Sequence, residues 1–388
     1  MLKDLYGRLC MTCVLRGVTE KALFCRFNDY CAASDGYEKI KAYAAFVSEI
    51  YNSRLSLTDY VLRLVFEDEN VYVKSRAHGD AVKDCVMESL VRELSVFEDF
   101  AALTPLDFKL DMGVDYVSPF ESYRADFTKL YNQRTEDIKR VGYGIFSSYP
   151  MFRLSDGGEI EPIISRDKIS LGSFVGYGEE RGRVIENTMA FLAGRPAANT
   201  LLCGDAGTGK SSTVKAVANS LFDKGLRLIE LRKDQLHYLP YVMGKVSENP
   251  LKFIIFIDDL SFNKSDDNFS MLKAALEGSA SAKADNAVIY ATSNRRHIIK
   301  ESFSDREGND VHINDTLQES LSLSERFGLV VLFSKPSRNL YLEIVRTLAE
   351  RAGVTVPVAE LDVMAEAFAL RRGTRSARCA EQFVNSLL

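Results

Sequence analysis

The stretch LLCGDAGTGKSSTV, residues 201–214, decides the fold of this chain. An apolar run that ends at Cys203 predicts a buried strand, and the segment after Ser211 is compatible with a helix. Between them, residues 204–211 spell G-x-x-x-x-G-K-S, the pattern of a phosphate-binding loop. Because this pattern is diagnostic only between a strand and a helix, its position here predicts that the chain binds a nucleotide.

The residue types in this loop suit the chemistry of phosphate binding. Glycines let successive backbone N–H groups point toward one phosphate, and the positive N-terminal end of the following helix adds to the attraction. The Lys210 ammonium is expected to reach the β- and γ-phosphates, and the Ser211 hydroxyl to bind Mg²⁺. The residues expected to contact the nucleotide here are Gly204, Asp205, Ala206, Gly207, Thr208, Gly209, Lys210, Ser211 and Ser212.

Composition restricts the classes of protein that the chain can represent. Its 388 residues suffice for two or three domains, and its net charge of −5 argues against a surface built for nonspecific binding to nucleic acid or membranes. The sequence has no apolar stretch of 18 residues and no signal-peptide pattern at its N-terminus, so we expect no membrane association. Seven scattered cysteines favour a reduced, cytoplasmic setting.

Four of these cysteines lie near the N-terminus. Cys10 and Cys13 form a C-x-x-C pair, and Cys25 and Cys31 follow it. A zinc site is one interpretation, but the second pair has the wrong spacing and both pairs lie in helix-like sequence. Small, buried, free cysteines are the favoured interpretation.

The first part of the chain, residues 1–150, predicts a mainly helical domain. Residues 37–51, 58–66 and 80–100 place apolar side chains three and four positions apart, and the pairs Thr104-Pro105 and Ser118-Pro119 are typical of helix starts. This region offers no catalytic constellation and does not reveal its partner. A hairpin turn is predicted at residues 156–158, either in a linker or in a strand pair added to the next domain.

From residue 165 onward, strands alternate with helices, which predicts a parallel α/β sheet. A helical segment follows Pro336 to the end. We therefore expect a P-loop NTPase domain at residues 163–336 and a helical lid at 337–388. The expected strands are residues 200–203, 227–231, 253–257, 287–291 and 329–333, and the expected helices are 179–192, 211–222, 234–246 and 269–277.

Polar residues follow two of the expected strands. Asp258 and Asp259 come directly after the apolar run FIIFI, so Asp258 is expected to bind Mg²⁺ and Asp259 to polarise the attacking water. A helix cap or a solvated turn is the alternative, which the preceding five apolar residues disfavour. Asn294 ends the stretch ATSN and is a candidate to contact the γ-phosphate or the water, although an asparagine alone is more often a turn residue.

In their order, these motifs resemble the AAA+ ATPases, and more narrowly a prokaryotic AAA+ family known only as a domain of unknown function. The resemblance covers residues 163–388 and implies ATP and Mg²⁺ as ligands. It implies that Arg326, in the run SLSERFG, is an arginine finger for a neighbouring subunit in a closed ring, with six as the expected number. Arg375, with Arg378 as second choice, corresponds to the lid arginine. The run Phe174-Val175-Gly176-Tyr177 corresponds to the adenine-contacting segment, with Val175 and Gly176 as the candidate contacts.

Two features depart from the general pattern of that family. Asp259 stands where most members have glutamate, which shortens the side chain by about one methylene and predicts slow hydrolysis. The run YVMG at residues 241–244 resembles a peptide-gripping pore loop, but a buried helix face is the favoured alternative. Residues 302–317 are polar and without periodicity, which predicts a mobile loop.

Three functions agree with this sequence. The leading hypothesis is an ATPase that remodels a protein partner selected by the N-terminal domain. The second is a DNA-associated loader or initiator, for which the only dense basic cluster is formed by Arg371, Arg372, Arg375 and Arg378. The third is a scaffold that binds ATP and hydrolyses it very slowly, which the substitution at Asp259 keeps open.

Overall fold

The computed structural model describes residues 2–34, 36–108, 117–164, 169–260, 267–276, 284–294 and 326–388. The chain forms two compact units, Met1–Ser148 and Tyr149–Leu388, which are described separately. The loop predicted at residues 302–317 and the first residues of the arginine-finger box, 322–325, lie outside the described residues. In the part of the chain that is described, no helix is both long enough and apolar enough to cross a membrane.

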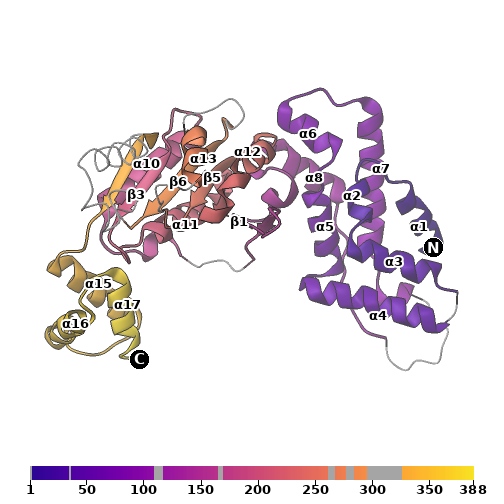
Figure 1. The fold of residues 1–388 in the computed structure, drawn as a ribbon. Helices are drawn as coiled ribbons and strands as arrows, with labels where there is room; N and C mark the ends of the chain where they lie inside the picture. The colour runs from indigo at the N-terminus through magenta and orange to yellow at the C-terminus, as the bar shows by residue number, and fades with distance from the viewer. Residues whose placement is uncertain are drawn as a thin grey trace. The chain divides into compact units, whose positions relative to one another are not determined.

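The first unit is helical, as predicted, and appears in indigo to purple in Figure 1. Its core is rich in aromatic rings that pack edge to face, such as Phe27 against Phe100. The predicted start at Thr104-Pro105 is confirmed as a short 3-10 helix. The helices are α1 (Leu2–Cys10), α2 (Arg16–Thr19), α3 (Ala22–Ala32), α4 (Gly36–Ser53), α5 (Leu57–Glu67), α6 (Val71–His78), α7 (Asp84–Ala101), α8 (Phe127–Glu136) and α9 (Ile138–Val141), with the 3-10 helices η1 (Pro105–Asp107) and η2 (Gly144–Ser147).

The helix start predicted at Ser118-Pro119 is wrong, because residues 117–126 form no helix. The backbone carbonyl of Ser118 accepts a hydrogen bond from the Tyr43 hydroxyl over 2.6 Å, and that of Pro119 accepts one from the Tyr51 hydroxyl over 2.5 Å. Both tyrosines belong to α4. Long-range bonds to α4 therefore satisfy carbonyls that a helix would have paired internally.

The second unit contains one seven-stranded sheet in the order β2-β1-β4-β5-β6-β3-β7. All neighbouring strands are parallel except β1 and β2. The central strands β3 and β5 are almost wholly buried, as expected of strands covered on both faces. The strands are β1 (Met151–Leu154), β2 (Ile160–Pro162), β3 (Thr200–Gly204), β4 (Leu226–Leu231), β5 (Lys252–Ile257), β6 (Ala287–Ser293) and β7 (Leu329–Phe333).

Helices alternate with the central strands along the chain, so the predicted fold class is confirmed: a P-loop NTPase sheet after a helical N-terminal region. The helices between strands are η3 (Leu171–Ser173), α10 (Gly178–Leu192), α11 (Lys210–Ser220), η4 (Phe222–Lys224), η5 (Lys233–Tyr238), α12 (Leu239–Ser247) and α13 (Asp267–Leu276). The predicted helix over residues 234–246 is divided into η5 and α12.

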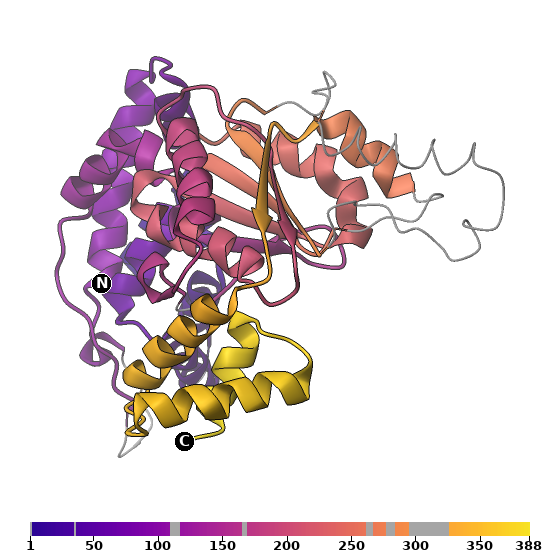
Figure 2. The ribbon, with the colours of Figure 1, turned by 90° about the vertical axis from the view of Figure 1, so that its left-hand side faces the viewer.

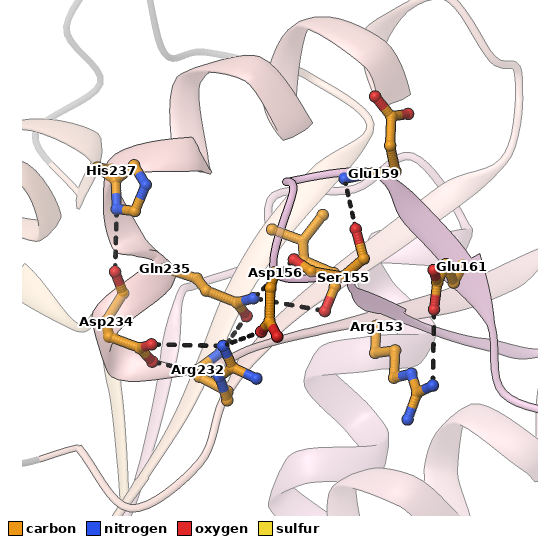
Figure 3. Close-up of polar contacts among 10 residues, drawn as sticks. Arg153, Ser155, Asp156, Glu159, Glu161, Arg232, Asp234, Gln235 and His237 are labelled. Carbon is orange, nitrogen blue, oxygen red and sulfur yellow. Dashed lines mark hydrogen bonds and ion pairs between the residues drawn. The ribbon is translucent and has the colours of Figure 1, made fainter.

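The hairpin β1–β2 belongs to the sheet, because β1 pairs in parallel with β4. Figure 3 shows how its turn is attached to η5: Arg232 forms an ion pair with Asp156 at 2.8 Å, and the Gln235 amide donates to the Ser155 carbonyl over 3.0 Å. Gly158 has φ +83°, and a side chain there would lie 2.5 Å from the Tyr238 ring. Of the two alternatives for this hairpin, the added strand pair is therefore correct.

Three helices follow the last strand: α15 (Arg338–Arg351), α16 (Val358–Arg372) and α17 (Ala377–Asn385). They pack around an apolar core of their own that includes Tyr341 and Phe383. Figure 2 shows them in orange and yellow below the sheet, joined to it by β7. We call these three helices the lid.

Candidate nucleotide-binding site

The strand order brings the predicted motifs to one edge of the sheet. Strands β5, β6 and β3 are neighbours and run in parallel, so their carboxyl ends lie side by side. The loop at residues 204–210 follows β3, the two aspartates follow β5, and Asn294 follows β6. In open α/β sheets this edge is where ligands bind.

The loop after β3 has a backbone that only glycine adopts easily. Gly204 has φ +135°, and a Cβ there would lie 2.0 Å from the Phe333 carbonyl oxygen. Gly207, at φ +76°, and Gly209, at φ +89°, are also left-handed, and Gly209 is the residue before α11. The loop therefore leads directly into a helix N-terminus, the geometry that binds phosphate.

Lys210 is buried, with 5% of its surface exposed, and its ammonium has three hydrogen-bond acceptors around it. Nζ donates to the carbonyl oxygens of Gly204 at 3.0 Å and Asp205 at 2.8 Å, and to Asn294 Oδ1 at 3.0 Å. Burial lowers the pKa of Lys210, while the Asp205 carboxylate opposes that shift. An anionic phosphate beside this ammonium would further stabilise its charged form.

Asp258 is held by two hydroxyl groups. Ser211 Oγ donates to Asp258 Oδ1 over 2.6 Å, and Thr292 Oγ1 donates to the same oxygen over 2.5 Å. A carboxylate and a hydroxyl at the phosphate loop are the hard oxygen ligands that Mg²⁺ prefers beside a nucleotide. The donor set therefore fits Mg²⁺, with Ser211 and Asp258 as the residues that would hold it.

Thr292 is a site residue that the sequence reasoning missed. It lies near the carboxyl end of β6, two positions before Asn294, within the stretch ATSN. That position was the available signal, since a side chain near the carboxyl end of this strand reaches the same edge of the sheet as Asn294.

Asp259 has an uncommon backbone for a residue other than glycine, with φ +51°. Its N–H donates to Thr292 Oγ1 over 2.9 Å, and its Oδ1 accepts from the Asn294 side-chain amide over 2.8 Å. These bonds aim the carboxylate toward Asn294, which in turn contacts Lys210. The residues that follow β5 and β6, together with Thr292 of β6 and the first residues of α11, thus form one hydrogen-bonded cluster.

The expected adenine segment lies between the sheet and the lid. Val175 packs against the lid core, and Gly176, at φ +70°, is so close to Leu340 of α15 that a Cβ would lie 2.4 Å from its Cδ1. Tyr177, the last residue of the expected segment, is left-handed at φ +52° and donates its hydroxyl to the Ser334 carbonyl over 2.6 Å.

The two candidate lid arginines have different surroundings. Arg375 Nη2 contacts Glu366 Oε2 at 2.8 Å, and Glu366 also pairs with Arg338 at 3.6 Å. The Arg378 backbone N–H, in contrast, donates to the Gly207 carbonyl over 3.4 Å. The structure thus brings the main chain of Arg378 to the phosphate loop and engages the side chain of Arg375 within the lid.

The remaining predicted residues are placed as follows. Thr208 is buried and donates its hydroxyl to the Asp205 carbonyl over 2.9 Å, Ala206 is exposed, and Ser212 is half-buried in α11. Arg326 is half-buried just before β7. Its action on a neighbouring subunit stays a prediction, because the structure holds a single copy of the chain.

The run YVMG at residues 241–244 lies within α12, where Val242 and Met243 are buried. The helix-face interpretation therefore holds. Among the residues that the structure describes, no group of three or more histidine, cysteine, aspartate or glutamate side chains is arranged to hold a metal ion. The N-terminal cysteines are free, but the expectation that they are buried is wrong: Cys10, Cys13 and Cys25 are exposed, and Cys31 is half-buried.

Comparison with known proteins places this unit in a family. Residues 147–388 match the family model described as "Protein of unknown function (DUF815)". Among curated proteins, the chaperone protein ClpB of Rickettsia bellii is 27% identical over 199 residues, which is 44% of this chain and 21% of that protein. ClpB 2 of Parasynechococcus marenigrum is 27% identical over 229 residues, 52% of this chain and 21% of that protein. The chain spans about a fifth of the length of these relatives.

Among solved structures, a single-residue variant of Thermotoga maritima RuvB matches 56% of this chain and 63% of its own length, at 18% identity and a TM-score of 0.39. The Thermotoga maritima RuvB Holliday junction branch migration motor matches the same shares, at 16% identity and a TM-score of 0.38.

Proposed function

This chain is a member of the DUF815 family of AAA+ proteins, and we propose that it binds ATP with Mg²⁺ and hydrolyses it to ADP and phosphate, slowly. The observation that carries this proposal is the hydrogen-bonded cluster of Lys210, Ser211, Asp258, Asp259 and Asn294 at the carboxyl edge of the sheet. It unites a phosphate-binding loop, a Mg²⁺ carboxylate and a second carboxylate near the expected γ-phosphate.

Each residue has a separate role in this proposal. The backbone N–H groups of residues 206–211 bind the phosphates, and Lys210 contacts the β- and γ-phosphates. Ser211 and Asp258 hold Mg²⁺, which neutralises phosphate charge when bound. Asp259 accepts a hydrogen bond from the attacking water, and Asn294 fixes the direction of the Asp259 carboxylate.

The wider role proposed for the chain is the remodelling of a protein partner selected by the helical N-terminal domain, residues 1–150. The ATPase domain is proposed as residues 163–336 and its lid as 337–388. We further propose a cytoplasmic homo-oligomer, a ring with six as the expected number, in which Arg326 of one subunit reaches the nucleotide of the next. Arg375 and Arg378 stay the two candidates for the lid arginine, and Val175 and Gly176 are proposed to contact adenine.

Two other functions are weighed against this one. A DNA-associated loader would use the basic cluster of the lid, but Arg375 is paired with Glu366 and Arg372 lies over the Phe368 ring. These engagements disfavour that cluster as a surface for nucleic acid. A slow, nucleotide-gated scaffold is favoured by the short side chain of Asp259. The backbone of Asp259 is left-handed, and hydrogen bonds to Thr292 and Asn294 hold the residue in place.

One assay separates these functions. The purified chain is tested for release of phosphate from ATP with and without Mg²⁺, with and without DNA, while its mass in solution is measured in parallel. Remodelling predicts Mg²⁺-dependent turnover that DNA leaves unchanged, a loader predicts stimulation by DNA, and a scaffold predicts tight binding with almost no turnover. Absence of ATP binding would overturn all three.

A further inference from the structure

The lid is joined to the sheet by a short hinge, residues 334–337, between β7 and α15. Two consecutive backbone groups of this hinge are held by side chains from the nucleotide site. The Ser334 carbonyl accepts from the Tyr177 hydroxyl over 2.6 Å, and the Lys335 N–H donates to Asp205 Oδ2 over 3.0 Å. Tyr177 is the last residue of the expected adenine segment, and Asp205 is the second residue of the phosphate loop.

The segment before Tyr177 is attached to the lid along α15. Arg351, the last residue of α15, donates to the carbonyls of Ser173 at 2.5 Å and Gly172 at 3.2 Å. Near the other end of α15, Leu340 covers Gly176, and Val175 packs against the lid core. Residues 172–176 are therefore attached to the lid, and the Phe174 ring, 4.7 Å from the Arg181 guanidinium of α10, attaches the same segment to the sheet side.

Asp205 and Tyr177 also contact Phe333, the last residue of β7, on the sheet side of the hinge. The Asp205 N–H donates to the Phe333 carbonyl over 3.2 Å, and the rings of Tyr177 and Phe333 are 5.5 Å apart. Tyr177 is mostly buried, and burial raises the pKa of its hydroxyl to about 12, so it stays a donor at neutral pH. The hinge is thus flanked by both segments that are expected to surround the nucleotide.

We propose that Asp205 and Tyr177 form a latch on the hinge, through which occupancy of the nucleotide site sets the position of the lid. This rests on the proposed nucleotide binding. Phosphate oxygens that enter the loop repel the nearby Asp205 carboxylate and change its bond to Lys335, while a base against residues 175–176 shifts Tyr177. Asp205 and Tyr177 act as positioning residues, since they act on the lid through the hinge.

The test is amide hydrogen exchange of the hinge in the full chain, with and without ADP, alongside ADP titration. In the absence of ADP, Asp205→Ala is expected to speed exchange at Lys335 by about tenfold, because its hydrogen bond is lost. Tyr177→Phe is also expected to speed exchange at Lys335, because the carbonyl of the same peptide, that of Ser334, loses its hydrogen bond from the Tyr177 hydroxyl. The ADP titration gives the affinity of each variant, and exchange is compared at saturating ADP, where ADP no longer changes exchange in the hinge and in α15 as it does in the unmodified chain.

Two further variants show whether the latch itself is responsible. Asp205→Asn keeps an acceptor oxygen for the Lys335 N–H and is expected to retain the exchange rate found without ADP. Ser337→Ala removes the hydroxyl that caps α15 by accepting from the Leu340 N–H, so it loosens the helix start yet leaves the response to ADP intact.

The outcomes separate this proposal from the proposed function. If the unmodified chain binds no ADP, the proposed function falls, and exchange in the absence of ADP still decides whether Asp205 and Tyr177 hold the hinge. If ADP binds and the hinge of Asp205→Ala responds as in the unmodified chain, the latch is overturned while nucleotide binding stands.

Discussion

The Thr292 hydroxyl donates to Asp258 Oδ1 over 2.5 Å and so joins the carboxyl ends of strands β6 and β5. The same hydroxyl oxygen accepts from the Asp259 N–H over 2.9 Å. Thr292 thereby orients both aspartates, the proposed Mg²⁺ ligand and the proposed water-polarising residue, from a single buried side chain.

Thr292→Val keeps the shape of this side chain and removes its hydroxyl. We expect a loss of about 1–3 kcal/mol in the free energy of unfolding, because Asp258 loses a buried hydroxyl donor and the Asp259 N–H keeps only its longer bond to Asp258 Oδ1 at 3.1 Å, together with weaker Mg²⁺ dependence of nucleotide binding. Urea unfolding and Mg²⁺ titration measure the two effects. Thr292→Ser retains the hydroxyl and is the matched control. Equal stability and equal Mg²⁺ dependence of the Val and Ser variants would show that the Thr292 hydroxyl does not orient the two aspartates.

Lys210→Ala is expected to abolish tight ATP binding, because it removes the charge expected to face the β- and γ-phosphates. Titration with a fluorescent ATP analogue measures the affinity, and circular dichroism checks that the fold is retained. Undiminished affinity in this variant would show that the phosphate-loop assignment is wrong.

Asp259→Asn is expected to bind ATP normally and to hydrolyse it more slowly, by about 10²-fold or more, since an amide is a poor acceptor of the water proton. The Asn294 amide, which now donates to Asp259 Oδ1, retains an acceptor oxygen in the variant. Single-turnover hydrolysis is the measurement. Unchanged turnover would show that Asp259 does not orient the attacking water and that another acidic residue has this role.

Arg326→Ala is expected to bind ATP almost normally and to lose hydrolysis by about 10³–10⁵-fold, the effect of arginine fingers elsewhere. Mixing it with Lys210→Ala is expected to restore activity, because each variant supplies at mixed interfaces what the other lacks. A chain that stays monomeric with ATP, and whose specific activity does not depend on its concentration, would instead place Arg326 in an ordinary surface ion pair.

Asp68→Asn tests a buried carboxyl group in the N-terminal unit. Burial raises the pKa of Asp68 to about 6 from its usual 3.8, even though it accepts a hydrogen bond from Asn70 over 3.1 Å. Because the folded pKa is the higher one, the charged form destabilises the fold above pH 6, and this penalty disappears below about pH 4. The variant is therefore expected to be more stable than the unmodified chain by about 1–3 kcal/mol at pH 7.5 and equally stable at pH 3.5. Denaturant unfolding at both pH values measures this, and a difference independent of pH would contradict it.

Much of the fold and the main residues of the site were predictable from the sequence alone. The phosphate loop, the apolar run before Asp258 and the alternation of strands and helices are patterns within a few residues of the chain. They reflect local requirements: glycine where the backbone is left-handed, apolar side chains along a strand buried on both faces, and a helix directly after the loop. Local patterns of this kind made the loop, both aspartates and Asn294 candidates without coordinates, and the structure brings these residues together.

Other features were decided by tertiary structure, because they depend on which strands and helices become neighbours. Pairing of β6 with β5 brings Thr292 to Asp258, and pairing of β1 with β4 places the hairpin in the sheet. Packing of residues 117–126 against α4 replaces the predicted helix, since the Tyr43 hydroxyl satisfies a carbonyl from 75 positions away. Likewise, the attachment of residues 172–176 to the lid joins segments more than 160 positions apart in sequence, a distance over which no local pattern carries information.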